Sequence, residues 1–409
     1  MSEVFSQELL LYGLKKDNRD GIRSRFSSLS ETDWKEVIDL ADEFGLGPIL
    51  YSILQDAQVE IPTSIENIFQ KLFLNNTARN LHLRVVFIEI TKALSEAGVQ
   101  FIPLKGIYLA SEVYQQQGFR VMSDIDILVQ RADLERAVAV VESLGYRPER
   151  PYSIDAEYQM FHHLPNYLRK GSPPLEIHFR LLMTMQQFNC DMDAVWERAI
   201  PQKTSIGDSR NLCPEDLLLY LCAHIAYHHL FVGALKSLYD IHLFLLKSGP
   251  RLDWTVIAER AKEWGVFNSL YLTLRLEEEI IGNAVPENVW LLIRPDDFDN
   301  QLIEAAIAKF FSHQELSRTI AMVWGNKKFT QRLSGVLRRI FLPPSVLTQK
   351  YKLHPQNKWL YFYYFVRLKD LLVNYSLDLW ALFRGETKTS ARSNDDGLLI
   401  KYLAWVETR

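Results

Sequence analysis

The stretch Ser123-Asp124-Ile125-Asp126-Ile127-Leu128-Val129 combines an apolar row with two regularly spaced acids. Its alternation predicts a β-strand, because successive side chains of a strand point to opposite faces of a sheet. Asp124 and Asp126 then share one face, and the apolar residues share the other. Two carboxylates on one face can hold a divalent cation, and hard oxygen ligands suit Mg²⁺. The alternative is a strand whose solvent-facing side happens to carry two acids.

A second strand of the same kind is expected at Leu175-Glu176-Ile177-His178-Phe179. Residues 163–169 and 175–182 flank Lys170-Gly171-Ser172-Pro173-Pro174, which predicts a β-hairpin. Glu176 and His178 share one face, so an antiparallel neighbour could place a third carboxylate beside the first two. Three acids on one face repel one another unless a cation neutralises them, and the combination therefore favours a metal site. His178 by itself favours a structural role.

Upstream, the β-prone run of residues 99–104 is closed by Lys105-Gly106, which predicts a strand that enters a helix over about residues 107–116. Free backbone N–H groups at a helix start can receive phosphate. Gly106 would allow close backbone approach and Lys105 would add a charge, although a plain turn is the alternative. Arg120 is a further candidate for a phosphate contact, or else a surface arginine.

Helical spacing dominates the rest of the chain. Apolar residues recur at this spacing from Trp34 to Leu54 after a start signal at Ser30 and Asp33, and again over residues 79–98. From Pro214 an apolar run predicts one long helix to about Leu246, so that strands are confined to about residues 80–185. We expect an α+β fold with a small mixed sheet as its core, flanked by N-terminal and larger C-terminal helical regions. The expected divisions are residues 1–78, 79–186 and 187–409.

Taken together, these motifs resemble the DNA polymerase β-type nucleotidyltransferase superfamily. Within it they look most like the uncharacterised bacterial nucleotidyltransferase-like family. The Lys-Gly and Arg-x-x-Ser-Asp-x-Asp spacing is also similar to that of AbiEii-type toxin nucleotidyltransferases. The residues that carry the resemblance are Leu104-Lys105-Gly106, Tyr114, Gly118, Arg120, the stretch 123–129 and Leu175-Glu176-Ile177-His178.

The resemblance implies a mechanism and a set of site residues. An NTP, expected to be ATP, would donate its nucleoside monophosphate to an acceptor and release pyrophosphate. Asp124 and Asp126 would coordinate two Mg²⁺ ions, and Glu176 would complete the second metal site or take the proton. The residues expected to bind the nucleotide are Lys105, Gly106, Arg120 and Ser123.

Three departures from the familiar superfamily pattern leave other functions open. A single glycine is followed by Ile107, the gap to Asp124 is longer, and Glu176 is the third acid. A non-catalytic, nucleotide-binding regulatory or scaffold protein is therefore one alternative, and an AbiEii-like toxin that modifies tRNA is another. The acceptor, whether a small molecule, a protein or RNA, is not encoded in these motifs.

Composition bounds the class of protein. The chain has 409 residues, 46 basic and 50 acidic groups, a net charge of -4 and three cysteines. This is ordinary globular composition, which excludes disordered and collagen-like proteins and predicts two or three domains. The odd, widely spaced cysteines suggest a reducing compartment, and neither a signal peptide nor a transmembrane segment is expected. Cytoplasmic localisation is the resulting expectation.

Charge is unevenly distributed. Residues 316–369 contain eleven Lys or Arg and no Asp or Glu, with an aromatic run at 359–366. This block could bind an anionic partner such as nucleic acid, a membrane surface or a phosphorylated substrate, or it could be a helical region with an aromatic core and solvated cations.

Two residue pairs with helical i, i+4 spacing follow Pro214. His224 and His228 would share a helix face, where packing or a substrate contact is favoured over zinc. Lys236 and Asp240 predict an ion pair, unless the helix closes over the catalytic face and offers one of them to substrate.

Overall fold

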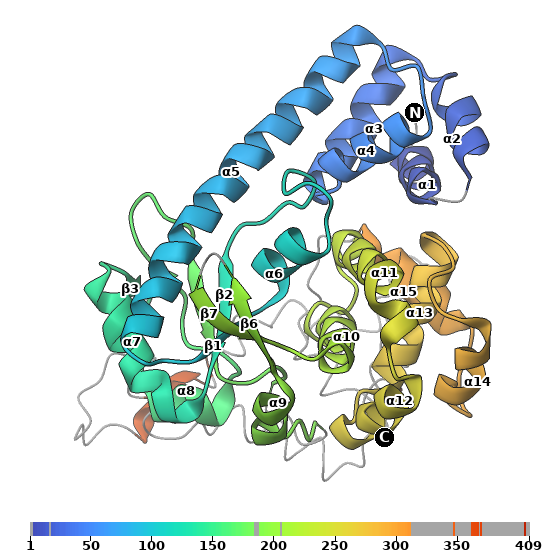
Figure 1. Ribbon diagram of the computed structural model, residues 1–409. Coiled ribbons are helices and arrows are strands. Elements are labelled where there is room, and N and C mark those ends of the chain that lie inside the picture. The colour runs from blue at the N-terminus through green and yellow to red at the C-terminus, as the bar shows by residue number, and fades with distance from the viewer. Residues whose placement is uncertain are drawn as a thin grey trace.

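The computed structural model describes residues 3–15, 18–183, 188–204, 207–311, 347, 361–367, 369 and 405. Over this part of the chain, a five-stranded mixed sheet is flanked by N-terminal and C-terminal helices (Figure 1). The α+β class expected from the sequence is therefore confirmed.

Four helices form the N-terminal unit and bury Phe26 and Trp34 between them. The start signal at Ser30 is a capping box: Ser30 Oγ accepts the N–H of Asp33 at 3.3 Å, and Asp33 Oδ2 accepts the N–H of Ser30 at 3.0 Å. The apolar core of this unit is continuous with that of the helices beyond Pro214. The helices are α1 (Glu3–Leu14), α2 (Arg19–Phe26), α3 (Glu31–Glu43) and α4 (Gly47–Asp56).

The long helix α5 (Thr63–Glu96) connects the N-terminal unit to the sheet (Figure 1). Its C-terminal half, the part expected from the sequence, packs Leu83, Phe87 and Ile90 into a second apolar core shared with the sheet. The expected division between residues 78 and 79 falls inside this helix, and the domain division remains a prediction.

The five-stranded sheet has the order β1-β2-β5-β4-β3. The central strands β2 and β5 are parallel, whereas the sequence predicted an antiparallel neighbour for the acidic strand. The expected hairpin is present, because β4 and β5 are antiparallel, with Tyr167 opposite Leu175. The strands are β1 (Phe101–Pro103), β2 (Ile125–Val129), β3 (Arg147–Pro148), β4 (Tyr167–Leu168) and β5 (Leu175–His178).

Three short helices lie between these strands in the sequence. The first, α6, begins at Lys105, directly after β1, and is shorter than the helix expected from the sequence. The second, α7, buries Leu134, Ala137 and Val141 in the sheet core. Their bounds are α6 (Lys105–Glu112), α7 (Leu134–Ser143) and α8 (Ile154–Met160).

Strands are not confined to residues 80–185, because a hairpin precedes Pro214. It pairs β6 (Ile200–Thr204) with β7 (Gly207–Asn211) and follows α9 (Met192–Arg198). The sequence of this hairpin is rich in polar residues and lacks the apolar alternation that predicts a strand, so the hairpin could not be predicted from it.

The long helix expected from Pro214 to Leu246 is interrupted in the middle. Helix α10 (Pro214–Ala223) passes into one π-helical turn at His224–His228, and α11 (Leu235–Ser248) starts only afterwards. Leu230 and Phe231 between them have φ values of 49° and 59°, which lie outside the right-handed helical region and interrupt the helix. The remaining helices are α12 (Trp254–Trp264), α13 (Phe267–Ile280), α14 (Trp290–Ile293) and α15 (Gln301–Phe310).

No helix in the described ranges is both long and apolar enough to span a membrane. The basic block of residues 316–369 lies outside the described residues, apart from 347, 361–367 and 369. Within that short piece Tyr361 and Phe365 are exposed. An anionic partner for the block remains a prediction.

Candidate active site

Asp126 and Glu176 lie side by side in the centre of the sheet. The parallel register of β2 and β5 pairs Asp126 with Glu176 and Leu128 with His178. Because side chains alternate along each strand, Asp126, Glu176 and His178 emerge on the same face. The sequence therefore predicted the neighbourhood of Glu176 correctly but the direction of the neighbouring strand wrongly.

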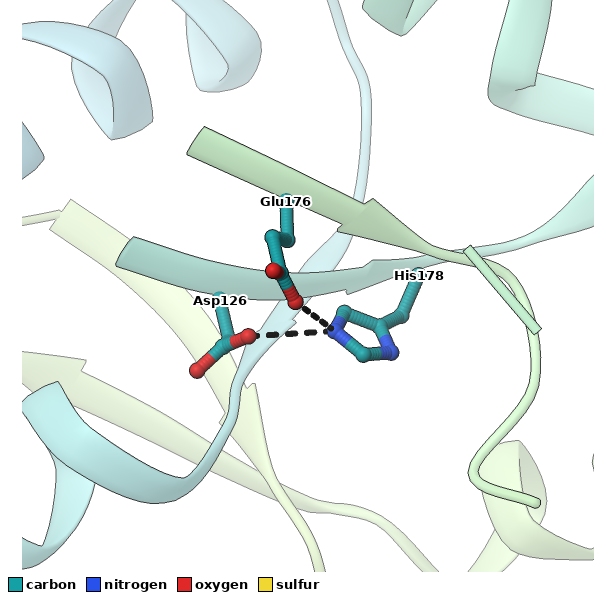
Figure 2. A group of neighbouring side chains, drawn as sticks. All are labelled: Asp126, Glu176 and His178. Atoms are coloured by element: carbon teal, nitrogen blue, oxygen red, sulfur yellow. Dashed lines mark hydrogen bonds and ion pairs between the residues drawn. The ribbon is translucent and has the colours of Figure 1, made fainter. Parts of the chain in front are cut away.

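His178 connects the two carboxylates (Figure 2). Its Nε2 lies 3.1 Å from Asp126 Oδ1 and 3.2 Å from Glu176 Oε2. One ligand atom from each of the three residues lies within 4.8 Å of the others, an arrangement that could hold a metal ion. The side chains of Asp126 and His178 are only 3% and 1% exposed, whereas that of Glu176 is 20% exposed and can be reached from solvent.

Lys105 reaches this group from the first turn of α6. Its Nζ lies 3.2 Å from Asp126 Oδ1 and donates to His224 Nε2 at 3.3 Å. The sheet fixes this position, because the N–H of Leu104 donates to the Asp126 carbonyl at 3.0 Å. The φ of Lys105 is +37°, a strained value for a residue with a side chain, and such strain is common at functional sites.

The charges of the group are mutually dependent. Burial alone would raise the pKa of Asp126, but Lys105 and His178 hold it below its ordinary value. Burial would likewise lower the pKa of His178, but its hydrogen bonds to Asp126 and Glu176 raise it. The pKa of Lys105 is raised by Asp126 against the opposing effect of burial. Asp126 therefore does not lie on a solvent-facing side of the strand, the alternative left open by the sequence, but in a buried ion network.

Asp124 stands directly before β2 and is half-buried. Burial raises its pKa, and the neighbouring charge of Asp126 adds to the effect. Among the described residues, the close ligand group consists of Asp126, Glu176 and His178 and does not include Asp124. A metal-binding or catalytic role for Asp124 therefore stays a prediction.

Gly106 and Arg120 are in contact at the start of α6. A Cβ built on Gly106 would lie 3.1 Å from Arg120 Nη1 and 3.5 Å from Met122 Sδ, so a larger residue would not fit without movement. Arg120 is 6% exposed and bound to Asp240, which rules out the surface-arginine alternative. Ser123 is exposed. The nucleotide contacts expected from Arg120 and Ser123 remain predictions.

A family model described as an uncharacterised nucleotidyltransferase matches residues 30–282 of this chain. The chain belongs to that nucleotidyltransferase family. The family expected from the sequence motifs is thereby confirmed, and the matched range contains every residue of the site described above.

Similarity of this nucleotidyltransferase to other known proteins is limited. The solution structure of the antibiotic-resistance factor ANT(2'')-Ia matches 50% of this chain and 98% of its own chain, with 14% sequence identity and a TM-score of 0.31. No curated protein has a significantly similar sequence.

A cluster of histidines surrounds the site of this nucleotidyltransferase. The ring of His178 lies 5.3 Å from that of His162 and 5.1 Å from that of His163, and His162 lies 4.6 Å from His228. His224 stacks on His228 at 5.1 Å. Sequence reasoning noted His224 and His228 but missed His162 and His163, because only the fold brings these segments together.

The role expected for His224 and His228, packing or a substrate contact rather than zinc binding, stays a prediction. In the described ranges no close group of ligand atoms forms other than that of Asp126, Glu176 and His178. Burial lowers the pKa of His162 and His224, and the positive charge of Lys105 acts in the same direction on both. The neutral form of these two rings is therefore favoured.

Two asparagines of α5 hold the loop that leads into β2. Asn76 Nδ2 donates to the carbonyls of Gly118 and Arg120 at 2.7 and 3.0 Å, and Asn80 Nδ2 donates to Arg120 O at 2.8 Å. Both side chains are buried. Sequence reasoning missed this contact, although two asparagines four residues apart on an apolar helix face were a usable signal.

Helix α10 and its π turn cover the acidic face of the sheet. His224 contacts Lys105, and Lys236 of α11 donates to the Val121 carbonyl at 3.1 Å. That this region supplies Lys236 or Asp240 to a substrate stays a prediction. Asp240, however, binds Arg120 rather than forming the expected ion pair with Lys236.

Proposed function

We propose that this protein is a metal-dependent nucleotidyltransferase that moves a nucleoside monophosphate from an NTP, expected to be ATP, to an acceptor. The observation that carries the proposal is the convergence of Asp126, Glu176 and His178 beside Lys105 at the start of α6. A carboxylate pair next to a cation at a helix start combines a metal site with a phosphate site.

The donor set fits a divalent cation. Two carboxylate oxygens and one imidazole nitrogen face one another within 4.8 Å, and two of the three side chains are almost fully buried. A cation bound there would neutralise triphosphate charge and stabilise the attacking and leaving oxygens. The family resemblance implies two Mg²⁺ ions. Binding of the second ion would require Asp124 as well.

The start of α6 is suited to the triphosphate. The N–H groups of the first helical turn are free to bind anions, and the helix dipole adds positive potential there. Gly106, whose missing side chain leaves room for Arg120, would contact the triphosphate through its backbone N–H, and Lys105 can exchange Asp126 for a phosphate oxygen. Lys105 thus links the metal site with the nucleotide site.

The proposed reaction is a displacement at the α-phosphorus. An acceptor hydroxyl oxygen forms a bond to that phosphorus, the bond to the bridging oxygen breaks, and pyrophosphate leaves with the electron pair. Glu176 receives the hydroxyl proton, because it is the most solvent-accessible carboxylate of the close group. One carboxylate oxygen of Glu176 can accept the proton while the other remains a metal ligand.

The test is transfer from α-³²P-labelled NTPs to small-molecule, protein and RNA fractions, tRNA included, with pyrophosphate release measured in parallel. We expect labelled acceptor and stoichiometric pyrophosphate with the wild type and a loss of at least about 100-fold in Asp126→Asn, as for removal of a key electrostatic group. Asp39→Asn, on the exposed face of α3, is the matched control.

Each outcome of this test separates the proposal from its alternatives. NTP binding without transfer to any fraction would support the non-catalytic regulatory protein. Labelling of tRNA together with growth arrest on expression would support the toxin. Equal transfer by the wild type and Asp126→Asn would refute the assignment of the site.

A further inference from the structure

The donor set of the site contains a nitrogen where the sequence predicted only oxygens. His178 Nε2 is 3.1 Å from Asp126 Oδ1 and 3.2 Å from Glu176 Oε2, so it faces the space between both carboxylates. The register of the parallel strands fixes this arrangement, because His178 is two residues after Glu176 on the same face of β5. Figure 2 shows the imidazole edge directed at the two acids.

The orientation of the His178 ring is fixed in advance. The rings of His162 and His163 lie 5.3 and 5.1 Å from it, and the side chain is 1% exposed. Its backbone is held as well, through an isolated bridge to His163 and the N–H of Phe179, which donates to the His162 carbonyl at 3.0 Å. A metal ligand held in this way loses little conformational entropy on binding.

Ligand chemistry then selects the ion. Mg²⁺ takes oxygen ligands in octahedral geometry and gives up its waters reluctantly, whereas imidazole suits the first-row transition metals. A buried set of one nitrogen and two carboxylate oxygens therefore matches a transition ion better than Mg²⁺.

We propose that the cation of this site is a divalent first-row transition metal, with His178 Nε2 as a direct ligand beside Asp126 and Glu176. The proposal rests on the proposed function only for the presence of a metal, and it replaces the expected Mg²⁺. The rival role for His178 is structural, in which Nε2–H merely donates to the two carboxylates.

Detection of the nitrogen separates the two roles. The experiment titrates the full-length wild type with Mn²⁺ alone, follows free Mn²⁺ by EPR, and records the electron spin echo modulation of the bound ion. Mn²⁺ generally has the lowest affinity for protein ligands among the divalent transition metals from Mn²⁺ to Zn²⁺. A preference of the site for Mn²⁺ over Mg²⁺ is therefore a demanding test. We expect ¹⁴N modulation from one imidazole and displacement of Mn²⁺ only by Mg²⁺ in large excess.

His178→Gln is the matched variant, because its amide keeps an oxygen donor of similar reach. We expect the ¹⁴N modulation to disappear, Mn²⁺ affinity to fall at least about tenfold, and the preference for Mn²⁺ over Mg²⁺ to shrink. His82→Gln is the control, since His82 is exposed on α5 and bonds only the Gly171 carbonyl among the contacts described for it. It should retain the wild-type spectrum and affinity.

The wild-type spectrum alone can overturn the proposal, so a poorly folded variant does not block the test. Bound Mn²⁺ without ¹⁴N modulation, no Mn²⁺ binding, or displacement by equimolar Mg²⁺ would each contradict it. The proposed function is tested separately: ¹⁴N modulation without nucleotidyl transfer would sustain the metal assignment and refute the activity. Mg²⁺-supported transfer without ¹⁴N modulation would do the reverse.

Discussion

Arg120 binds Asp240 through two parallel hydrogen bonds, with Nε donating to Oδ1 at 2.9 Å and Nη2 donating to Oδ2 at 2.8 Å. The pair is buried, and it joins the loop before β2 to helix α11, with a third bond from the Tyr114 hydroxyl to Asp240 at 2.7 Å. These hydrogen bonds therefore connect the loop before the acidic strand β2 to the C-terminal helices next to the site.

Breaking this pair should destabilise the fold strongly. Removing one partner leaves a buried charge uncompensated, so Arg120→Met or Asp240→Asn should each lower the free energy of unfolding by about 3–5 kcal/mol. Urea denaturation measures the change. Lys92→Met, which removes the exposed pair with Glu96, should cost less than about 1 kcal/mol. A loss of less than about 1 kcal/mol in Arg120→Met would show that the Arg120–Asp240 pair does not stabilise the fold.

The loop before β2 should not tolerate a side chain at residue 118. A Cβ on Gly118 would overlap Thr77 Oγ1 and lie 2.6 Å from the Phe73 ring, where α5 passes the loop. Gly118→Ala should therefore destabilise the protein by about 1–3 kcal/mol. It should also reduce nucleotidyl transfer, because this loop leads to Asp124 and Asp126. Thermal unfolding and the transfer assay measure both effects.

The control for residue 118 is Gly249→Ala, where the added Cβ would lie 3.9 Å from the Ala284 carbonyl, an ordinary contact. That variant should resemble the wild type in stability and transfer. A Gly118→Ala protein with wild-type stability would mean that α5 and the loop are not packed as described.

Lys236 should give the protein a distinct pH dependence. Burial, reinforced by the charge of Arg120, lowers the pKa of Lys236 from 10.5 to about 8. The unfolded chain therefore binds a proton more readily, and the native state loses stability as pH falls from about 10.5 to about 8. Lys236→Met lacks this loss, so its stability relative to the wild type should increase as pH is lowered through this range.

Urea denaturation at several pH values between about 7.5 and 10 measures this linkage. Lys35→Met, on the exposed side of α3, is the matched control. A difference for Lys236→Met that is constant with pH would contradict the lowered pKa.

Lys105 should affect metal and nucleotide binding in opposite directions. Its ammonium group forms an ion pair with Asp126 Oδ1 at 3.2 Å. Lys105→Met therefore frees that oxygen for a metal ion and removes a positive charge from the site. Mn²⁺ should then bind more tightly without nucleotide. NTP affinity should fall about tenfold, because one charge-assisted hydrogen bond to phosphate is lost.

Calorimetric titrations with Mn²⁺ and with an NTP measure the two affinities, and Lys71→Met on the exposed side of α5 is the control. A parallel loss of both affinities would indicate that Lys105→Met disrupts the site. An unchanged NTP affinity would remove Lys105 from the nucleotide site.

The sequence predicted those parts of the fold that depend on local patterns. The alternation at 123–129 gave the strand β2, and the turn at Lys105-Gly106 gave the start of α6. Glu176 could be placed near Asp126 because a neighbouring strand would carry it on the same face of the sheet. The class of fold and the family followed from these same residues.

Long-range packing decided what the sequence could not show. No local pattern reveals that β2 and β5 are parallel, that Arg120 finds Asp240, or that His162 comes to rest against His228. The break after α10 could not be predicted because the apolar pattern of α10 continues through the π turn. His178 was noticed on the correct face, but only the register makes it a partner of both acids.

The most direct test of the central claim is a crystal structure of the wild type with Mn²⁺ and an NTP analogue whose α,β bridge cannot be cleaved. We predict one ion ligated by Asp126, Glu176 and His178, with the triphosphate against the first turn of α6 and Lys105 on a phosphate oxygen. Nucleotide bound elsewhere, for example in the cavity of about 310 Å³ between α4 and α11, with no ion at Asp126, would contradict it.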